Sequence, residues 1–156
     1  MDEKKLLKYA VDYLSKYDSS KVNLVNVLKR KILRLKTTNY EKGKLINIIE
    51  SIIIKLEKNK FIDDNRYSST KILSLSNSGK SKNFIFNYLL KKGVNKTQIQ
   101  NNLNLMQQDN DNWELNSAKI FAKKKKLLEK DQSYEKNLAK MARAGFSYDI
   151  CKKILG

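Results

Sequence analysis

The apolar residues of this chain recur at helical spacing along nearly its whole length. Leu6, Ala10, Tyr13, Leu14 and Tyr17 fall at positions i, i+4, i+7, i+8 and i+11, so they share one side of an α-helix. Strict alternation of apolar and polar residues between Asn-Gly or Asp-Gly turns, which would indicate strands, does not occur. Short polar breaks rich in Asn, Asp, Ser and Gly separate the helical segments. We therefore predict an all-α fold of about nine helices.

Several helix ends have recognisable capping residues. Thr38 and Glu41 have the spacing of a capping box, which predicts a helix that runs from there to Leu56. The segment 131–133 is expected to start the helix that Gly145 ends. Asp63-Asp64 could be imagined as a metal-binding pair, but adjacent residues of a helix point about 100° apart. We interpret the pair as a cap, because acids at a helix N-terminus accept hydrogen bonds from free N–H groups.

Two parts of the sequence repeat. When Ser20 is aligned with Ser81, the apolar residues that follow coincide, and the basic pairs Arg30-Lys31 and Lys91-Lys92 coincide ten residues later. When Gly93 is aligned with Gly145, an apolar residue follows each glycine and the next apolar positions keep the same spacing. The helices therefore fall into groups of three.

These repeats predict three modules of three helices each, at residues 1–60, 61–108 and 109–156. A three-helix module buries little apolar surface by itself, so stacked neighbours must complete its core. We expect an elongated, curved array with an extended concave face.

The charge of the chain points to a polyanionic or acidic partner. It has 33 Lys and Arg against 16 Asp and Glu, a formal charge of +17. Nucleic acid relieves the self-repulsion of such a body by counterion release. Codon bias is the alternative, because Lys, Asn and Ile are abundant together, although it explains the two-to-one excess of bases less well.

The composition leaves little catalytic equipment. With one Cys and no His, the chain cannot form an internal disulfide, an ordinary zinc site or a His-based triad. We expect no enzymatic activity, no metal, no cofactor and no small-molecule substrate. The longest strongly apolar run is three residues, 52–54, and the first residues do not form a secretory signal. We therefore expect a cytoplasmic monomer without a membrane segment.

One short motif imitates a phosphate-binding loop. Gly79-Lys80-Ser81 resembles the end of a P-loop, but that motif needs a glycine where Ser74 stands and a strand before it. We interpret it as a glycine helix stop followed by a serine cap.

Basic residues recur near the ends of corresponding helices, where stacked modules could align them. Lys and Arg also favour helix C-termini for dipole reasons. The candidates for contact with phosphate or an acidic partner are Arg30, Lys31, Arg34, Lys91, Lys92, Lys123, Lys124, Arg143, Lys152 and Lys153.

Four segments in this order resemble the RecX family of recombination regulators. They are residues 61–67 (Phe-Ile-Asp-Asp-Asn-Arg-Tyr), 79–82 (Gly-Lys-Ser-Lys), 89–94 (Leu-Leu-Lys-Lys-Gly-Val) and 142–149 (Ala-Arg-Ala-Gly-Phe-Ser-Tyr-Asp). The resemblance covers nearly the whole chain, and the last segment is the most specific.

The resemblance implies tandem three-helix units and a non-enzymatic regulator. RecX-like proteins bind the RecA recombinase, lie along its nucleoprotein filament and restrain filament growth, strand exchange and ATP hydrolysis, and some also contact single- or double-stranded DNA. On this basis we assign structural roles to the residues of the matched segments. They are Asp63, Asp64, Arg66, Tyr67, Gly93, Gly145, Phe146 and Tyr148.

A second hypothesis is a basic DNA-binding protein that acts without RecA, such as a helix-turn-helix transcription regulator. It needs a helix with base-reading side chains on one exposed face. Gln98, Asn101 and Asn102 are the candidates, although Gln98 and Asn102 flank the apolar positions of their helix.

Overall fold

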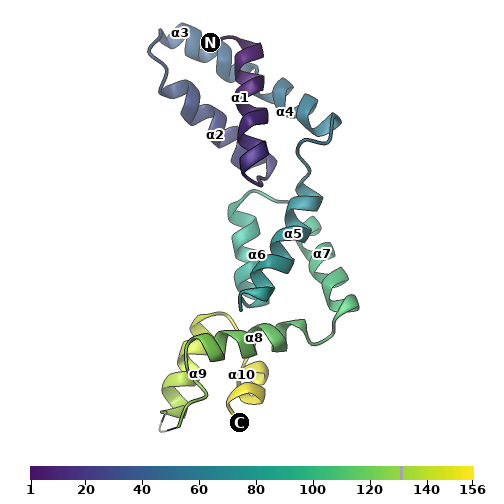
Figure 1. Cartoon of the computed structure of the whole chain (residues 1–156), viewed down its shortest axis with the longest axis vertical. Helices are drawn as coiled ribbons and strands as arrows, with labels where there is room; N and C mark the ends of the chain where they lie inside the picture. The colour runs from purple at the N-terminus through teal and green to yellow at the C-terminus, as the bar shows by residue number, and fades with distance from the viewer. Residues whose placement is uncertain (131) are drawn as a thin grey trace. The chain divides into compact units, whose positions relative to one another are not determined.

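The computed structural model describes residues 1–130 and 132–156, and in that part of the chain all regular structure is helical (Figure 1). Asp131, placed above at the start of a helix, lies outside the described residues. The all-α prediction is confirmed. The described residues form ten helices: α1 (Glu3–Lys16), α2 (Lys21–Leu33), α3 (Asn39–Asn47), α4 (Ile49–Lys58), α5 (Asp64–Asn77), α6 (Lys82–Lys91), α7 (Lys96–Asp109), α8 (Trp113–Lys124), α9 (Tyr134–Arg143) and α10 (Tyr148–Leu155).

The described residues contain one helix more than predicted, because the segment after Thr38 is interrupted at Ile48. The backbone N–H of Ile48 donates to the carbonyl of Leu45, three residues back, at 3.2 Å. This tighter turn ends α3, and α4 begins at the next residue. No Pro or Gly marks the break, and the apolar spacing continues across it, so the sequence pattern did not reveal it.

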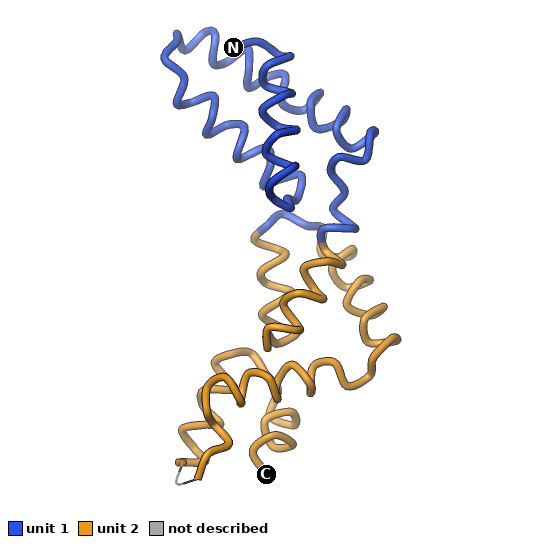
Figure 2. The backbone as a smooth tube through the Cα atoms, viewed as in Figure 1, with its two compact units in different colours: residues 1–67, 92–94 blue, residues 68–91, 95–156 orange. Residues whose placement is uncertain are grey.

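The chain divides into two compact units (Figure 2). Unit 1 comprises residues 1–67 and 92–94, and unit 2 comprises residues 68–91 and 95–156. The division into three modules and the curved array remain predictions.

Unit 1 is built around α2, which packs against α1, α3 and α4 (Figure 1). Each helix contributes the residues of its apolar stripe to one core. The buried residues of this cluster are Leu6, Ala10, Leu24, Leu28, Ile32, Leu45, Ile49, Ile52, Ile53, Leu56 and Ile62.

In unit 2, α10 packs against α8 and α9, and α6 packs against α7. One buried cluster contains Ala118, Ala122, Leu127, Met141, Phe146 and Cys151. Cys151 is fully buried in this cluster, so it is a small core residue, and burial raises the pKa of its thiol. None of the described helices is long and apolar enough to cross a membrane.

The caps explain why the helices begin where they do. Thr38 Oγ1 accepts a hydrogen bond from the backbone N–H of Glu41 at 3.2 Å, as predicted. The Glu41 side chain turns instead toward Lys44, 4.0 Å from its Nζ, so Thr38 supplies the cap by itself. Ser133 and Ser147 cap α9 and α10 in the same way.

Gly79 and Gly145 end helices by the same device. Both have positive φ, +90° and +96°. The backbone N–H of each glycine and that of the next residue donate hydrogen bonds to carbonyls of the last helical turn, three and five residues back. The segment 79–81 is therefore the predicted helix stop, and Ser81 is the cap of the next helix, with its Oγ 3.1 Å from the N–H of Phe84.

Candidate functional site

The repeat predicted from the sequence corresponds to a repeated structural joint. In unit 1, Ser20 is fully buried and is the N-cap of α2: its Oγ accepts from the N–H of Asn23 at 3.1 Å. The same hydroxyl donates to the carbonyl oxygen of Lys92. Gly93 follows with φ +80°, and a Cβ at this position would lie 2.4 Å from Cβ of Val22. We call this set of residues the first joint.

Unit 2 contains the same arrangement, the second joint. Ser81 is fully buried, caps α6 and donates from Oγ to the carbonyl oxygen of Ala144 at 2.7 Å. Gly145 follows, and a Cβ there would lie 2.5 Å from Oγ of Ser81. The two serines and the two glycines are the pairs that the sequence alignment placed together.

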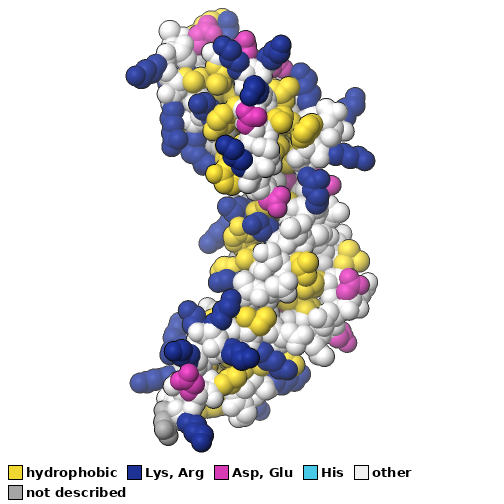
Figure 3. Space-filling model, viewed as in Figure 1, with side chains coloured by type: hydrophobic (Ala, Val, Ile, Leu, Met, Phe, Trp, Pro, Cys, Tyr) yellow, Lys and Arg dark blue, Asp and Glu magenta, His cyan; other side chains and the backbone are white. Residues whose placement is uncertain are grey.

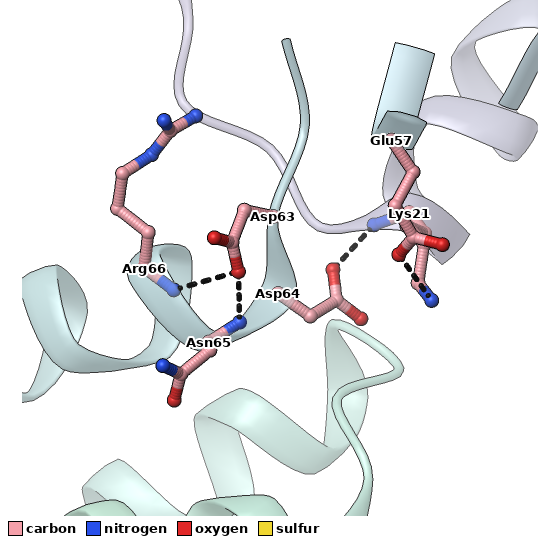
Figure 4. A network of polar contacts seen from close by, with 6 residues as sticks. All are labelled: Lys21, Glu57, Asp63, Asp64, Asn65 and Arg66. Carbon is pink, nitrogen blue, oxygen red and sulfur yellow. Dashed lines mark hydrogen bonds and ion pairs between the residues drawn. The ribbon is translucent and has the colours of Figure 1, made fainter. Parts of the chain in front are cut away.

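An acidic side chain completes each joint by capping a helix to which it does not belong. Asp64 Oδ1 accepts from the N–H of Lys21, the first residue of α2, at 2.8 Å (Figure 4). Glu114 Oε2 accepts from the N–H of Lys82, the first residue of α6, at 2.9 Å. Each carboxylate thus satisfies a free N–H at the positive end of a helix dipole.

Asp63 and Asp64 therefore have different roles. Asp63 Oδ1 accepts from the N–H groups of Asn65 at 2.9 Å and Arg66 at 3.1 Å, so it caps α5 as predicted (Figure 4). Asp64 caps α2 instead of its own helix. Among the described residues, no three or more Cys, His, Asp or Glu gather as a metal site would require.

At the first joint, the pKa values of Lys21 and Asp64 are both raised, for different reasons. Lys21 Nζ lies 2.8 Å from Oε2 of Glu57, and this hydrogen bond raises the pKa of Lys21 (Figure 4). Burial raises the pKa of the Asp64 carboxyl, and this effect exceeds the opposing hydrogen bond from the Lys21 N–H. The fold thus needs an acceptor at this position more than it needs a charge.

Asp64→Asn is therefore expected to be tolerated, whereas Asp64→Ala is expected to destabilise the protein by about 1–3 kcal/mol, because it leaves the Lys21 N–H without its acceptor. A raised carboxyl pKa means that protonation favours the folded state, so the contribution of Asp64 is largest below its ordinary pKa and is lost as the pH rises. The stability of Asp64→Asn relative to wild type should therefore increase from pH 4 to pH 7 in urea unfolding. A decrease over this range would contradict the assigned balance.

The other residues of the matched segments fall into a buried and an exposed group. Tyr67 and Phe146 are 6% and 4% exposed and belong to the interior. Arg66 and Tyr148 are exposed, and Lys152 Nζ lies 5.4 Å from the ring centroid of Tyr148.

Most of the basic candidates lie on the surface, near the ends of α2, α6, α8, α9 and α10. Arg30, Arg34, Lys123 and Lys153 are exposed. Figure 3 shows many Lys and Arg side chains and few acidic ones on the visible face of each unit.

Four other candidates have local partners. Lys31 Nζ lies 5.0 Å from the ring centroid of Tyr9, and Lys124 Nζ donates to the carbonyl of Ser78 at 3.1 Å. Lys152 lies over Tyr148, as described above, and the carbonyl of Lys92 belongs to the first joint.

Lys91 and Arg143 are brought together, although they are far apart in the sequence. Both line one surface pocket of unit 2 with a volume of about 300 Å³. The other lining residues are Asn83, Phe84, Asn87, Tyr88, Ala144 and Gly145. The pocket has two cations and no acidic side chain in its lining, so it is suited to an anionic ligand.

Lys91 was the only residue in the α6 wall of this pocket that was predicted from the sequence as a contact candidate. Phe84, Asn87, Tyr88 and Lys91 fall at i, i+3, i+4 and i+7, so they form one face of α6. That spacing was readable, but the opposite wall comes from the turn after α9, which the sequence could not place.

The candidate base-reading residues do not share an exposed face. Asn102 is 7% exposed and Gln98 is half-buried, whereas Asn101 is exposed. Asn101 lines a second pocket of unit 2, of about 670 Å³, together with Lys82, Gln100, Asn104 and Glu114. The buried Asn102 side chain cannot reach a base edge in a DNA groove.

The sequence was compared with models of protein families and with known proteins. No model of a known protein family matches the sequence. Over 154 residues the chain is 31% identical to the regulatory protein RecX of Myxococcus xanthus (strain DK1622), covering 94% of this chain and 81% of that protein.

Two solved structures share the fold. The crystal structure of RecX from Lactobacillus salivarius superposes with a TM-score of 0.71 at 22% identity, over 97% of this chain and 93% of that one. A second crystal structure of a regulatory protein RecX gives a TM-score of 0.70 at 22% identity, over 96% and 70% of the two chains. Because it is 31% identical to the Myxococcus protein over most of both chains, the chain belongs to the RecX family of regulatory proteins.

Proposed function

We propose that this protein binds the nucleoprotein filament of the RecA recombinase and restrains its recombinase and ATPase activities in DNA repair and recombination. The observation that carries the proposal is 31% identity, over nearly the whole chain, to a regulatory protein named RecX. The resemblance of the four sequence segments supplies RecA as the partner. The protein acts by binding and has no catalytic step of its own.

The charge of the chain supports attraction to such a filament. A formal charge of +17 raises the rate of encounter with a phosphate-rich or acidic groove. The three proposed modules then contact several RecA subunits in turn, and each later contact is intramolecular, so its cost in translational freedom is small. Bridged subunits neither add monomers nor move as strand exchange requires.

Lys91 and Arg143 are the basic candidates that we expect to matter most, because they converge on one pocket. In RecA-driven ATP hydrolysis on single-stranded DNA, wild-type protein is expected to inhibit at concentrations well below those that coat the DNA. The double variant Lys91→Glu/Arg143→Glu should need an about tenfold or higher concentration for half inhibition, since each reversal turns an attraction into a repulsion. Lys119→Glu, an exposed position of α8 outside the pocket, is the matched control and should act like wild type.

DNA binding without RecA is the competing function, and the same assay separates the two. Binding to bare DNA is measured in parallel from 50 to 200 mM salt, where a phosphate-driven complex weakens steeply. Tight, salt-sensitive DNA binding with no effect on RecA at any concentration would overturn the proposal. Equal inhibition by wild type and the double variant would leave RecA as partner and remove the pocket from the contact surface.

A further inference from the structure

The pocket that holds Lys91 and Arg143 has walls that the second joint keeps in place. One wall is the face of α6 formed by Phe84, Asn87, Tyr88 and Lys91, and the other is the turn from Arg143 to Gly145. The hydrogen bond from Ser81 Oγ to the carbonyl of Ala144, 2.7 Å long, ties the start of α6 to that turn. The pocket is thus largely formed before a ligand arrives, which reduces the entropic cost of binding.

The charges of the pocket select an anion. Lys91 and Arg143 are both exposed, and within the described part of the chain neither has a carboxylate within 4.0 Å. The ammonium group of Lys80 lies 4.6 Å from the ring centroid of Phe84, beside the pocket, and adds a third positive charge. A guanidinium group binds a carboxylate or a phosphate through two parallel hydrogen bonds.

The remaining lining selects a peptide with an apolar side chain. Phe84 is 40% exposed, and its ring lies 6.4 Å from that of Tyr88 at an interplanar angle of 22°. These rings give the pocket an apolar wall that water solvates poorly. Asn83 and Asn87 carry amides, which can donate to and accept from a peptide backbone.

The aromatic rings are poorly placed for a nucleobase. Lys80 covers Phe84 from above its ring, and Tyr88 is stacked against Phe84. Stacking of single-stranded nucleic acid requires open aromatic faces. Lys80 takes one face of the Phe84 ring, so a base has less ring face to stack on, whereas an apolar side chain needs contact only with the exposed part of the ring.

We propose that this pocket binds an acidic peptide segment, with one apolar side chain against Phe84 and Tyr88 and carboxylates on Lys91 and Arg143. The pocket of about 670 Å³ shares Asn83 and Gly145 with it, so an extended segment has room to continue. The inference deepens the proposed function, because it gives the chemistry of the surface that Lys91 and Arg143 contact. Its test needs no RecA. Peptide binding can therefore fail while inhibition of RecA is observed, and peptide binding can be observed while inhibition of RecA fails.

The test uses synthetic peptides and the full chain. A fluorescein-labelled nonapeptide, Gly-Asp-Asp-Gly-Phe-Gly-Asp-Asp-Gly, is titrated with protein and followed by fluorescence anisotropy. Its controls replace all Asp by Asn, or Phe by Ala, and an oligothymidylate of four phosphates serves as a nucleic-acid probe of equal charge. The protein variants are Lys91→Glu, Arg143→Glu and Phe84→Ala, with Lys119→Glu as the matched control and far-UV circular dichroism to establish folding.

We expect saturable binding of the acidic Phe peptide, weakened about tenfold or more by Lys91→Glu and by Arg143→Glu, and unchanged by Lys119→Glu. Wild-type protein should bind the Phe peptide more tightly than the Ala peptide, and Phe84→Ala should remove this difference in affinity. A purely electrostatic contact would give the two peptides equal affinity for the wild-type protein. The proposal is overturned if the three pocket variants bind the peptide like wild type. It is overturned equally if oligothymidylate binds more tightly and loses affinity in the same variants, because the pocket then accepts nucleic acid.

Discussion

Gly93→Ala and Gly145→Ala are each expected to lower the free energy of unfolding by about 2–4 kcal/mol. Both glycines have φ in the left-handed region, +80° and +96°, where a side chain costs about 1 kcal/mol. A Cβ would also lie 2.4 Å from Cβ of Val22 at the first joint and 2.5 Å from Oγ of Ser81 at the second. Neither neighbour can move freely, since Val22 is near the start of α2 and Ser81 Oγ makes two hydrogen bonds. Urea unfolding followed by circular dichroism measures the effect.

Gly43→Ala is the matched control for both glycine variants. Gly43 lies inside α3, and a Cβ there would meet nothing within 4 Å. Alanine is the better helix former, so this variant should be more stable than wild type by about 0.5–1 kcal/mol. If Gly93→Ala and Gly145→Ala unfolded at the same urea concentration as Gly43→Ala, the close approach at the joints would be refuted.

Phe146→Ala is expected to lower the free energy of unfolding by about 3–5 kcal/mol, the range for loss of a buried aromatic ring. Phe146 is 4% exposed, lies 5.5 Å between ring centroids from Phe121 and shares a buried cluster with Met141 and Cys151. Its removal leaves a cavity among residues of α8, α9 and α10. The fluorescence of Trp113, the one tryptophan of the chain, reports the unfolding of unit 2 in urea.

Tyr148→Ala, two residues further on, tests whether burial is the cause. Tyr148 belongs to the same sequence motif but is 61% exposed. Its loss should therefore change the free energy of unfolding by about 0.5 kcal/mol or less. Equal destabilisation by the two variants would indicate that the motif acts through something other than the packing of Phe146.

The local features of the fold were predictable, because they depend on residues close together in the chain. The helical spacing of apolar residues needs about eleven residues to be visible, and the caps at Thr38, Asp63 and Ser81 need four. The break at Ile48 was missed because a tightened turn without Pro or Gly leaves the apolar spacing intact. Lys91 and Arg143 were named as contact candidates because basic residues recur near helix ends, and nothing in the sequence indicated that the two converge on one pocket.

The sequence by itself determined the helices apart from the break at Ile48, most of their caps, and the pairing of Ser20 with Ser81 and of Gly93 with Gly145, since each rests on short-range chemistry or on internal repetition. Only the tertiary structure decided that each serine hydroxyl reaches the carbonyl before the glycine of its joint. It also decided that Asp64 and Glu114 cap helices other than their own. Such contacts join residues between 32 and 72 positions apart, and they form only when packing of the apolar faces has brought the helix ends together.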